Sequence, residues 1–125
     1  MSYLYSELTG SILKCAYKVH SELGPGLLES AYEECLFYEL AKNDIKAIRQ
    51  KPMPLTYNGI QMDIGYRIDL LIESKVIVEI KSVESYNPIY TAQLMTYMKL
   101  SSCRVGILIN FNVISLKDGI KRIII

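Results

Sequence analysis

The chain has 125 residues, of which 50% are hydrophobic and 22% are charged, and its formal net charge is +1. Its length and composition predict one globular domain, residues 1–125, and exclude a disordered chain. The near-neutral charge excludes an overall attraction to nucleic acid, so any such contact requires a local patch. The three scattered cysteines form no CxxC pair. We expect a cytoplasmic protein that avoids membranes, because the sequence shows neither a signal peptide nor the roughly 18-residue apolar run of a membrane span.

The first third of the sequence predicts a helical hairpin. Apolar residues recur with helical spacing from Leu4 to Leu23, and again from about Leu27 to Lys42. Gly24-Pro25-Gly26 lies between the two segments. It ends the first helix, because glycine accepts the left-handed cap conformation and proline cannot continue the helix.

The remaining two thirds predict a mixed central β-sheet flanked by helices, an α/β or α+β fold. We expect strands over 47–57, 60–72, 76–81, 105–110 and 120–125, and a helix over 89–101. Pro52 and Pro54 indicate an edge position for the first strand. Asn58-Gly59 predicts a tight hairpin to the second strand. The apolar final strand requires pairing, either inside the sheet or in a homodimer interface.

Charged residues interrupt two of the apolar strands. Glu79 and Lys81 share one face of the strand over 76–81, because side chains alternate along a strand, and Asp69 interrupts the preceding strand. A three-residue turn over 73–75 would place Asp69 opposite Glu79, whereas a two-residue turn would point Asp69 to the other face. We expect the three-residue turn. Two adjacent buried carboxylates require a compensating cation, such as a divalent metal; the alternative is a solvated or salt-bridged sheet face.

These residues carry a family resemblance. Asp69 followed by Glu79-Ile80-Lys81 resembles the D…(D/E)xK core of the PD-(D/E)XK nuclease superfamily. Residues 26–32 read G-x-x-E-x-x-Y and resemble the small bacterial group of GxxExxY proteins, which is placed in that superfamily. Residues 93–97 read Q-x-x-x-Y and are similar to the RecB-type nucleases. Ile68 departs from the pattern, because it stands where the superfamily name has proline.

The resemblance implies a restriction-endonuclease-like fold and a nuclease that depends on Mg²⁺ or Mn²⁺. It implies that Asp69 and Glu79 bind the metal and that Glu29 supplies a further acid from the second helix. His20 is an additional candidate ligand; the alternative is a structural histidine. For Glu29 the alternative is a first-turn acid that stabilises the helix N-terminus through the helix dipole.

The resemblance also implies catalytic roles for three side chains. Lys81 would orient or activate the attacking water and stabilise the charge that develops on the phosphate. Gln93 and Tyr97 lie one helical turn apart and would hold Lys81 or a substrate phosphate; the alternative is an ordinary polar–aromatic pair. Basic residues that are candidates for further phosphate contacts are Lys46, Arg49, Lys51, Arg67, Lys75, Lys99 and Arg104.

Three classes of function follow from these patterns. The first is a metal-dependent nuclease that acts on DNA or, as the second choice, RNA. The second is a catalytically silent nuclease fold that binds nucleic acid or a protein partner, and the third is a small scaffold domain. The sequence contains neither a Walker A motif nor a zinc finger. An active enzyme of this kind would therefore cut with little sequence preference or depend on a partner protein for targeting.

Overall fold

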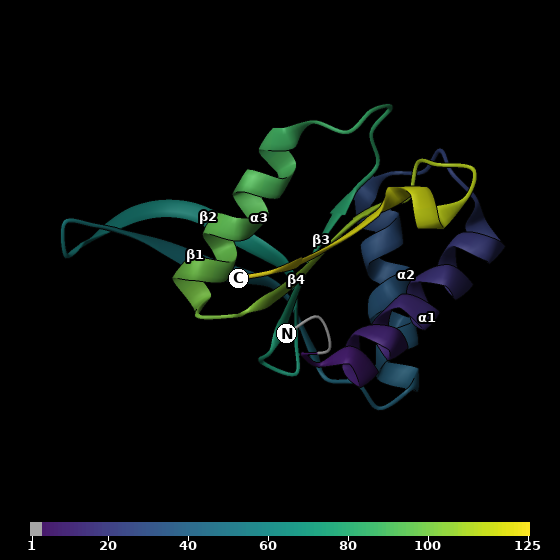
Figure 1. Ribbon diagram of the computed structural model, residues 1–125, viewed down its shortest axis with the longest axis horizontal. Helices are drawn as coiled ribbons and strands as arrows, with labels where there is room; N and C mark the ends of the chain where they lie inside the picture. The colour runs from purple at the N-terminus through teal and green to yellow at the C-terminus, as the bar shows by residue number, and fades with distance from the viewer. Residues whose placement is uncertain (1–3) are drawn as a thin grey trace.

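The computed structural model describes residues 4–125 as a five-stranded sheet with helices on both faces (Figure 1). The helices are α1 (Ser6–Leu23), α2 (Glu29–Lys42) and α3 (Pro88–Ser101), with a short 3-10 helix η1 (Leu116–Gly119). The strands are β1 (Ala47–Tyr57), β2 (Ile60–Ile72), β3 (Val76–Lys81), β4 (Val105–Asn110) and β5 (Ile120–Ile124). The prediction of a mixed sheet flanked by helices is confirmed.

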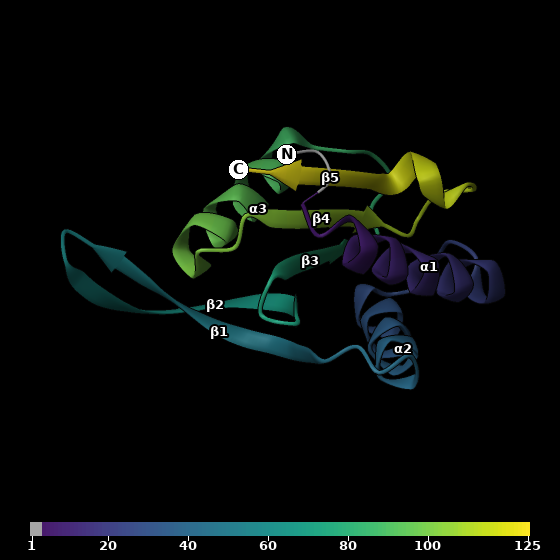
Figure 2. The same cartoon turned by 60° about the horizontal axis from the view of Figure 1, so that its bottom comes forward.

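The strands lie in the order β1-β2-β3-β4-β5, which Figure 2 shows from one side of the sheet. Neighbouring strands are antiparallel except β3 and β4, which are parallel and are joined by α3 as a crossover. The Asn87 side chain accepts a hydrogen bond from the Ile89 amide (3.0 Å), and Pro88 occupies the first turn. This cap starts α3 because it satisfies an amide that has no partner inside the helix.

The two faces of the sheet are covered by different helices. On one face, α1 and α2 pack on the apolar side chains Val76, Val78 and Ile80 of β3. On the other face, α3 packs on a smaller cluster that includes Ile77 of β3 and Leu108 of β4. Because side chains alternate along β3, Glu79 and Lys81 lie on the α3 face.

The β1–β2 hairpin extends beyond the rest of the sheet (Figure 2). Asn58 (φ 52°) and Gly59 (φ 77°) form its two-residue turn, with Tyr57 paired to Ile60. The register shifts between Met53 and Leu55, around Pro54. The predicted hairpin and the edge position of β1 are both confirmed.

The start of α2 differs slightly from the sequence prediction. Leu28 is extended (φ −71°, ψ 152°), so the helix begins at Glu29 and not at Leu27. Gly26 has φ +99°, a conformation that L side chains rarely adopt. The turn therefore continues through Leu28 and presents Glu29 at the first helical position.

The last strand, β5, pairs with β4 and occupies an edge of the sheet. The prediction that this apolar segment is paired inside the sheet is confirmed, and its participation in a homodimer stays a prediction. Within residues 4–125, none of the helices combines the length and the apolar character that crossing a membrane requires.

Candidate active site

The turn between β2 and β3 sets the register that brings the two acids together. Ile72 pairs with Val76 and Leu70 pairs with Val78, so the turn contains three residues, 73–75. The Lys75 amide donates to the Ile72 carbonyl (2.9 Å), which closes the turn. The same register places Asp69 opposite Glu79, as the three-residue alternative predicts.

The two carboxylates are interlocked through the backbone of the opposite strand. The Asp69 amide donates to Glu79 Oε2 (2.8 Å), and the Ile80 amide donates to Asp69 Oδ2 (2.8 Å). Each acid therefore accepts a hydrogen bond from the strand that carries the other acid. This reciprocal arrangement holds both side chains in one orientation between β2 and β3.

Burial makes this pair of acids electrostatically unfavourable. Glu79 is only 5% exposed, and burial followed by repulsion from Asp69 raises its pKa to about 8. Burial also raises the pKa of Asp69, with a further contribution from the charge of Glu29. A bound cation would relieve both effects, because it stabilises the ionised form of each carboxylate.

Gln50 joins the acid pair to α2, a role that the sequence did not reveal. Its amide nitrogen donates to Glu33 Oε1 (2.6 Å) and to Asp69 Oδ1 (3.3 Å). Gln50 also has a left-handed backbone (φ 50°) in the middle of β1. Such strain persists only where surrounding contacts maintain it, and here it accompanies a side chain that spans two carboxylates.

Glu33 and Arg49 form an ion pair beside this bridge. Glu33 is 6% exposed and accepts from Arg49 Nε (3.2 Å) and Nη2 (3.1 Å). Arg49 also pairs with Glu34 (2.8 Å) and lies over the Phe37 ring. The guanidinium proposed from sequence as a phosphate contact thus already neutralises two acids of α2. The only sequence signal for Glu33 was its position one helical turn after Glu29.

Lys81 lies on the same face of β3 as Glu79. Its Nζ is 4.8 Å from the centre of the Tyr90 ring, a cation–π distance. Among residues 4–125 it forms no direct ion pair with Asp69 or Glu79. The ammonium is therefore placed at the margin of the acid pair, on the side where α3 begins.

Tyr97 lies near the acid pair, whereas Gln93 is on the exposed side of α3. Tyr97 is 6% exposed, and its pKa is raised by burial first and then by the charge of Glu79. Its ring lies 6.2 Å from that of Tyr66 of β2. Gln93 is exposed one helical turn earlier. Of the predicted Q-x-x-x-Y pair, the structure places the tyrosine at the acids and leaves the glutamine facing outward.

The G-x-x-E-x-x-Y segment forms the turn that positions Glu29. The Tyr32 hydroxyl donates to the Gly24 carbonyl (2.6 Å) and accepts from the Leu27 amide (3.1 Å). The Tyr32 ring is fully buried and stacks on Phe111 at 4.5 Å. Glu29 itself is exposed, and it lies close enough to raise the pKa of Asp69.

His20 has a structural environment. Its Nε2 lies 2.8 Å from the Val113 carbonyl oxygen, and its ring lies against Phe111. Because a carbonyl only accepts, Nε2 carries the proton in this contact and is not a free metal ligand. The recorded contacts of His20 thus join α1 to the segment after β4.

The donor set fits a hard divalent cation. In the described part of the chain, 4–125, there is no group of three or more His, Cys, Asp and Glu side chains that could hold a metal. Mg²⁺ typically uses only one or two carboxylates and completes its shell with water and substrate phosphate oxygens. The half-buried Asp69 and the buried Glu79, with oxygen as their only donor type, match that requirement.

Comparison with known proteins agrees with this geometry. The family model described as the PD-(D/E)XK nuclease superfamily matches residues 6–123. No curated protein and no solved structure matches the chain. The matched segment contains Asp69 of β2 and Glu79 and Lys81 of β3, and the two acids are linked through backbone amides of the opposite strand. The chain therefore belongs to the PD-(D/E)XK nuclease superfamily.

Proposed function

We propose that this protein is a Mg²⁺- or Mn²⁺-dependent nuclease that hydrolyses phosphodiester bonds of DNA, with RNA as the second choice of substrate. The observation that carries the proposal is the interlocked pair of the half-buried Asp69 and the buried Glu79, with Lys81 on the same face of β3 as Glu79. Two carboxylates whose pKa values burial raises form a site that favours a cation. Membership of the superfamily supports phosphodiester hydrolysis as the chemistry.

In this proposal Asp69 and Glu79 hold the metal, and Glu29 approaches it from the first turn of α2. The cation would neutralise charge on the phosphate oxygens. Lys81 would orient or activate the attacking water and stabilise the charge that develops on the phosphate. To reach that position its ammonium would leave the face of Tyr90, which requires only side-chain rotation.

Tyr97 and Gln93 have supporting roles in the same proposal. Tyr97 would hold Lys81 or a substrate phosphate, and its burial and the effect of the Glu79 charge on its pKa support a place beside the acids. Gln93, exposed one turn away, would hold a substrate phosphate at the mouth of the site. His20 is left out, because its Nε2 is engaged with Val113.

We further propose that the chain is one of the GxxExxY proteins and functions as one cytoplasmic domain. The support for the group is structural: Gly26 takes a left-handed turn, Glu29 starts α2 beside Asp69, and the Tyr32 hydroxyl closes the turn. A homodimer through β5 and a partner protein that supplies targeting belong to the same proposal, since β5 occupies a sheet edge.

One observation favours a second candidate, a catalytically silent module that binds nucleic acid or a protein. The Lys81 ammonium lies over Tyr90 and forms no ion pair with either acid in the described chain. In an active site this lysine must approach the scissile phosphate. The experiment below separates the two functions.

The test is cleavage of labelled single- and double-stranded DNA and RNA with Mg²⁺ or Mn²⁺, for wild type, Asp69→Ala and Lys81→Ala. We expect wild type to cut, and each substitution to lower the rate by at least about 100-fold, the effect of losing an electrostatic group at a reacting phosphate. Lys42→Ala, an exposed lysine on α2, is the matched control and should cut normally. An intact, metal-binding wild type that cuts none of the substrates would reject the nuclease and favour the silent module.

A further inference from the structure

A cavity of about 160 Å³ lies beside the acid pair on the α3 face of the sheet. Its principal lining residues are Lys81, Tyr86, Tyr90, Leu108, Asp118 and Lys121. Only Lys81 among these belongs to the proposed catalytic group. The cavity is therefore an additional site that shares one wall with the first.

The sheet register connects the cavity to the catalytic carboxylates. Glu79 of β3 pairs with Leu108 of β4, and Leu108 pairs with Lys121 of β5. Glu79, Leu108 and Lys121 thus form one row across the α3 face. Since neighbouring strands lie about 4.8 Å apart, the backbone at Lys121 is roughly 10 Å from that at Glu79. A chain molecule bound at the acid pair would pass Lys81, which lines the cavity, and continue towards Lys121.

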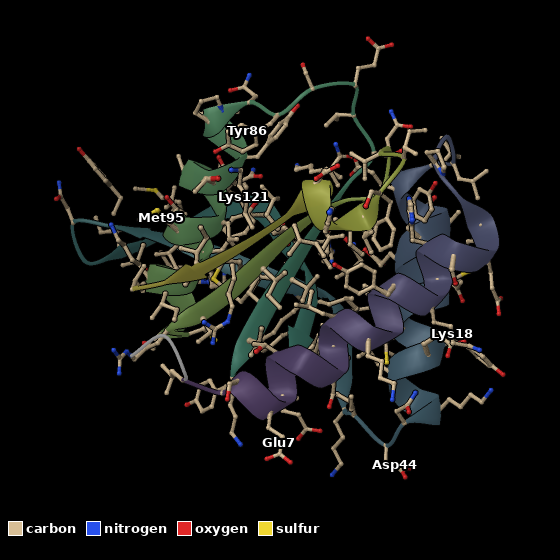
Figure 3. All side chains as sticks on the ribbon, turned by 45° about the vertical axis from the view of Figure 1, so that its right-hand side comes forward. Glu7, Lys18, Asp44, Tyr86, Met95 and Lys121 are labelled. Atoms are coloured by element: carbon tan, nitrogen blue, oxygen red, sulfur yellow. The ribbon has the colours of Figure 1, made fainter. Side chains whose placement is uncertain are left out.

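Two tyrosines and two lysines line this cavity, and each lysine lies over one of the two rings. Lys121 Nζ lies 4.4 Å from the centre of the Tyr86 ring, and Lys81 Nζ lies 4.8 Å from that of Tyr90. The two rings meet edge to face, with centres 6.4 Å apart. Figure 3 shows Tyr86 and Lys121 close together at the start of α3. Aromatic faces combined with ammonium groups are the elements that single-stranded nucleic-acid sites use.

The Tyr86 ring is exposed but held in place. It is 46% exposed, and its hydroxyl is hydrogen-bonded to Thr91 Oγ1 (2.7 Å). An exposed aromatic ring with a fixed orientation loses little conformational entropy when a flat ligand stacks on it. Carboxylates of Glu84 and Asp118 also line the cavity, so it is not simply an anion site. A nucleotide matches this mixed lining, because its base has hydrogen-bonding edges and a flat face while its phosphate is anionic.

We infer that this cavity binds an unpaired nucleotide next to the scissile phosphate, with the base against Tyr86 and the phosphate at Lys121. The inference rests on the proposed nuclease function and gives it a substrate class, single-stranded nucleic acid. A paired base in a duplex has both faces covered by its neighbours and reaches Tyr86 only by leaving the stack, which costs a few kcal/mol. Unpaired strands enter the cavity without that cost.

The test is direct binding, measured by fluorescence anisotropy with labelled single-stranded deoxythymidine and uridine oligomers and with a blunt DNA hairpin. EDTA is present, so binding is separated from cleavage. We expect both single strands to bind more tightly than the hairpin. We expect Tyr86→Ala and Lys121→Gln each to weaken single-strand binding roughly tenfold, within the range for one stacked base. Lys121→Gln should also lower the salt slope of log Kd by about 0.7, the value for one phosphate contact on a single strand.

Matched variants control for surface and folding effects. Tyr38→Ala and Lys42→Gln remove an exposed tyrosine (62% exposed) and an exposed lysine of α2, and both should bind as wild type does. Tyr86→Phe keeps the ring and loses only the bond to Thr91, so it should retain most of the affinity. Tighter binding of the hairpin, or wild-type affinity in both Tyr86→Ala and Lys121→Gln, would overturn the inference.

The binding and cleavage experiments can each reject one proposal without rejecting the other. A protein that binds single strands through Tyr86 and cuts none of them keeps this inference and loses the nuclease function. A protein that cuts only duplex DNA, with the same rate in Tyr86→Ala, keeps the nuclease function and loses this inference.

Discussion

The two faces of β3 differ in what they contribute to the protein. On the face towards α1 and α2, the side chains of Val78 and Ile80 are at most 1% exposed and belong to the larger apolar cluster. On the face towards α3, Ile77 is equally buried, but Glu79 and Lys81 follow it. A single six-residue strand therefore stabilises the fold with one face and carries the candidate chemistry with the other. On the α3 face Glu79 is buried and Lys81 is half-buried, so the charged side chains occupy positions that an apolar core would otherwise fill.

The apolar face should show the largest stability effect. Ile80→Ala leaves a cavity in a fully packed cluster and should lower the free energy of unfolding by about 3 kcal/mol. Its backbone amide still donates to Asp69, so stabilisation by Mg²⁺ or Mn²⁺ should persist. Chemical denaturation with and without metal measures both quantities. Ile64→Ala, on the extended hairpin and 47% exposed, is the control and should be nearly neutral.

If Ile80→Ala removed the metal response while the protein stayed folded, the two faces of β3 would not be separable.

A substitution on the charged face should impair cleavage and leave the stability of the metal-free protein intact, whereas Ile80→Ala should lower stability. Glu79→Gln should lower cleavage at least about 100-fold, while the metal-free protein stays as stable as wild type or becomes more stable. The expected cause is that glutamine stays neutral at every pH, whereas Glu79 buries a charge beside Asp69 once the pH rises through its raised pKa of about 8. Glu7→Gln, an exposed first-turn acid of α1, is the control.

The same variant tests the pH dependence of stability. The pKa of Glu79 is raised from 4.5 to about 8, so the folded chain retains a proton that the unfolded chain has lost. This contribution to stability is fully present below about pH 4.5 and is lost as the pH rises through about 8. Thermal unfolding of the wild type in EDTA should show that decline, and Glu79→Gln should flatten it. Equal pH profiles for the two proteins would contradict the assignment of a protonated Glu79.

A substitution of Gln50 tests whether its hydrogen bonds to Glu33 of α2 and to Asp69 matter for catalysis. Gln50→Ala removes both amide hydrogen bonds and should lower kcat about tenfold with little change in KM, because Asp69 loses its positioning contact. Gln50→Gly removes the same bonds but relieves the left-handed backbone, so it should be more stable than Gln50→Ala by about 1 kcal/mol. Equal stability of the two variants would show that the left-handed backbone at residue 50 does not lower the stability of the protein.

The smallest effect is expected at the turn that presents Glu29. Tyr32→Phe leaves the Gly24 carbonyl and the Leu27 amide without the hydroxyl and should lower stability by about 1 kcal/mol. Tyr38→Phe, on the exposed side of the same helix, should have no effect. Denaturant midpoints measure the difference. A neutral Tyr32→Phe would mean that the left-handed Gly26 alone maintains the turn.

The amino-acid sequence by itself determined the elements and one half of the candidate site. Hydrophobic periodicity placed α1, α2, α3 and the five strands to within a few residues, because a buried face imposes its period on the chain, whereas the short η1 was not predicted. Alternation along 76–81 also determined that Glu79 and Lys81 share a face. The Asn58-Gly59 hairpin followed from local backbone preference alone.

Tertiary structure decided the rest, because those contacts join residues that are distant in the chain. The sequence allowed two registers for the β2–β3 turn, and only the paired strands selected the one that joins Asp69 to Glu79. Gln50 reaches Glu33 of α2 and Asp69 of β2 at once, and the cavity at Tyr86 combines a loop, a helix and an edge strand. Hydrophobic periodicity does not predict these long-range contacts, since it indicates only which face of an element is buried. What lies across from each face is decided when the elements pack together.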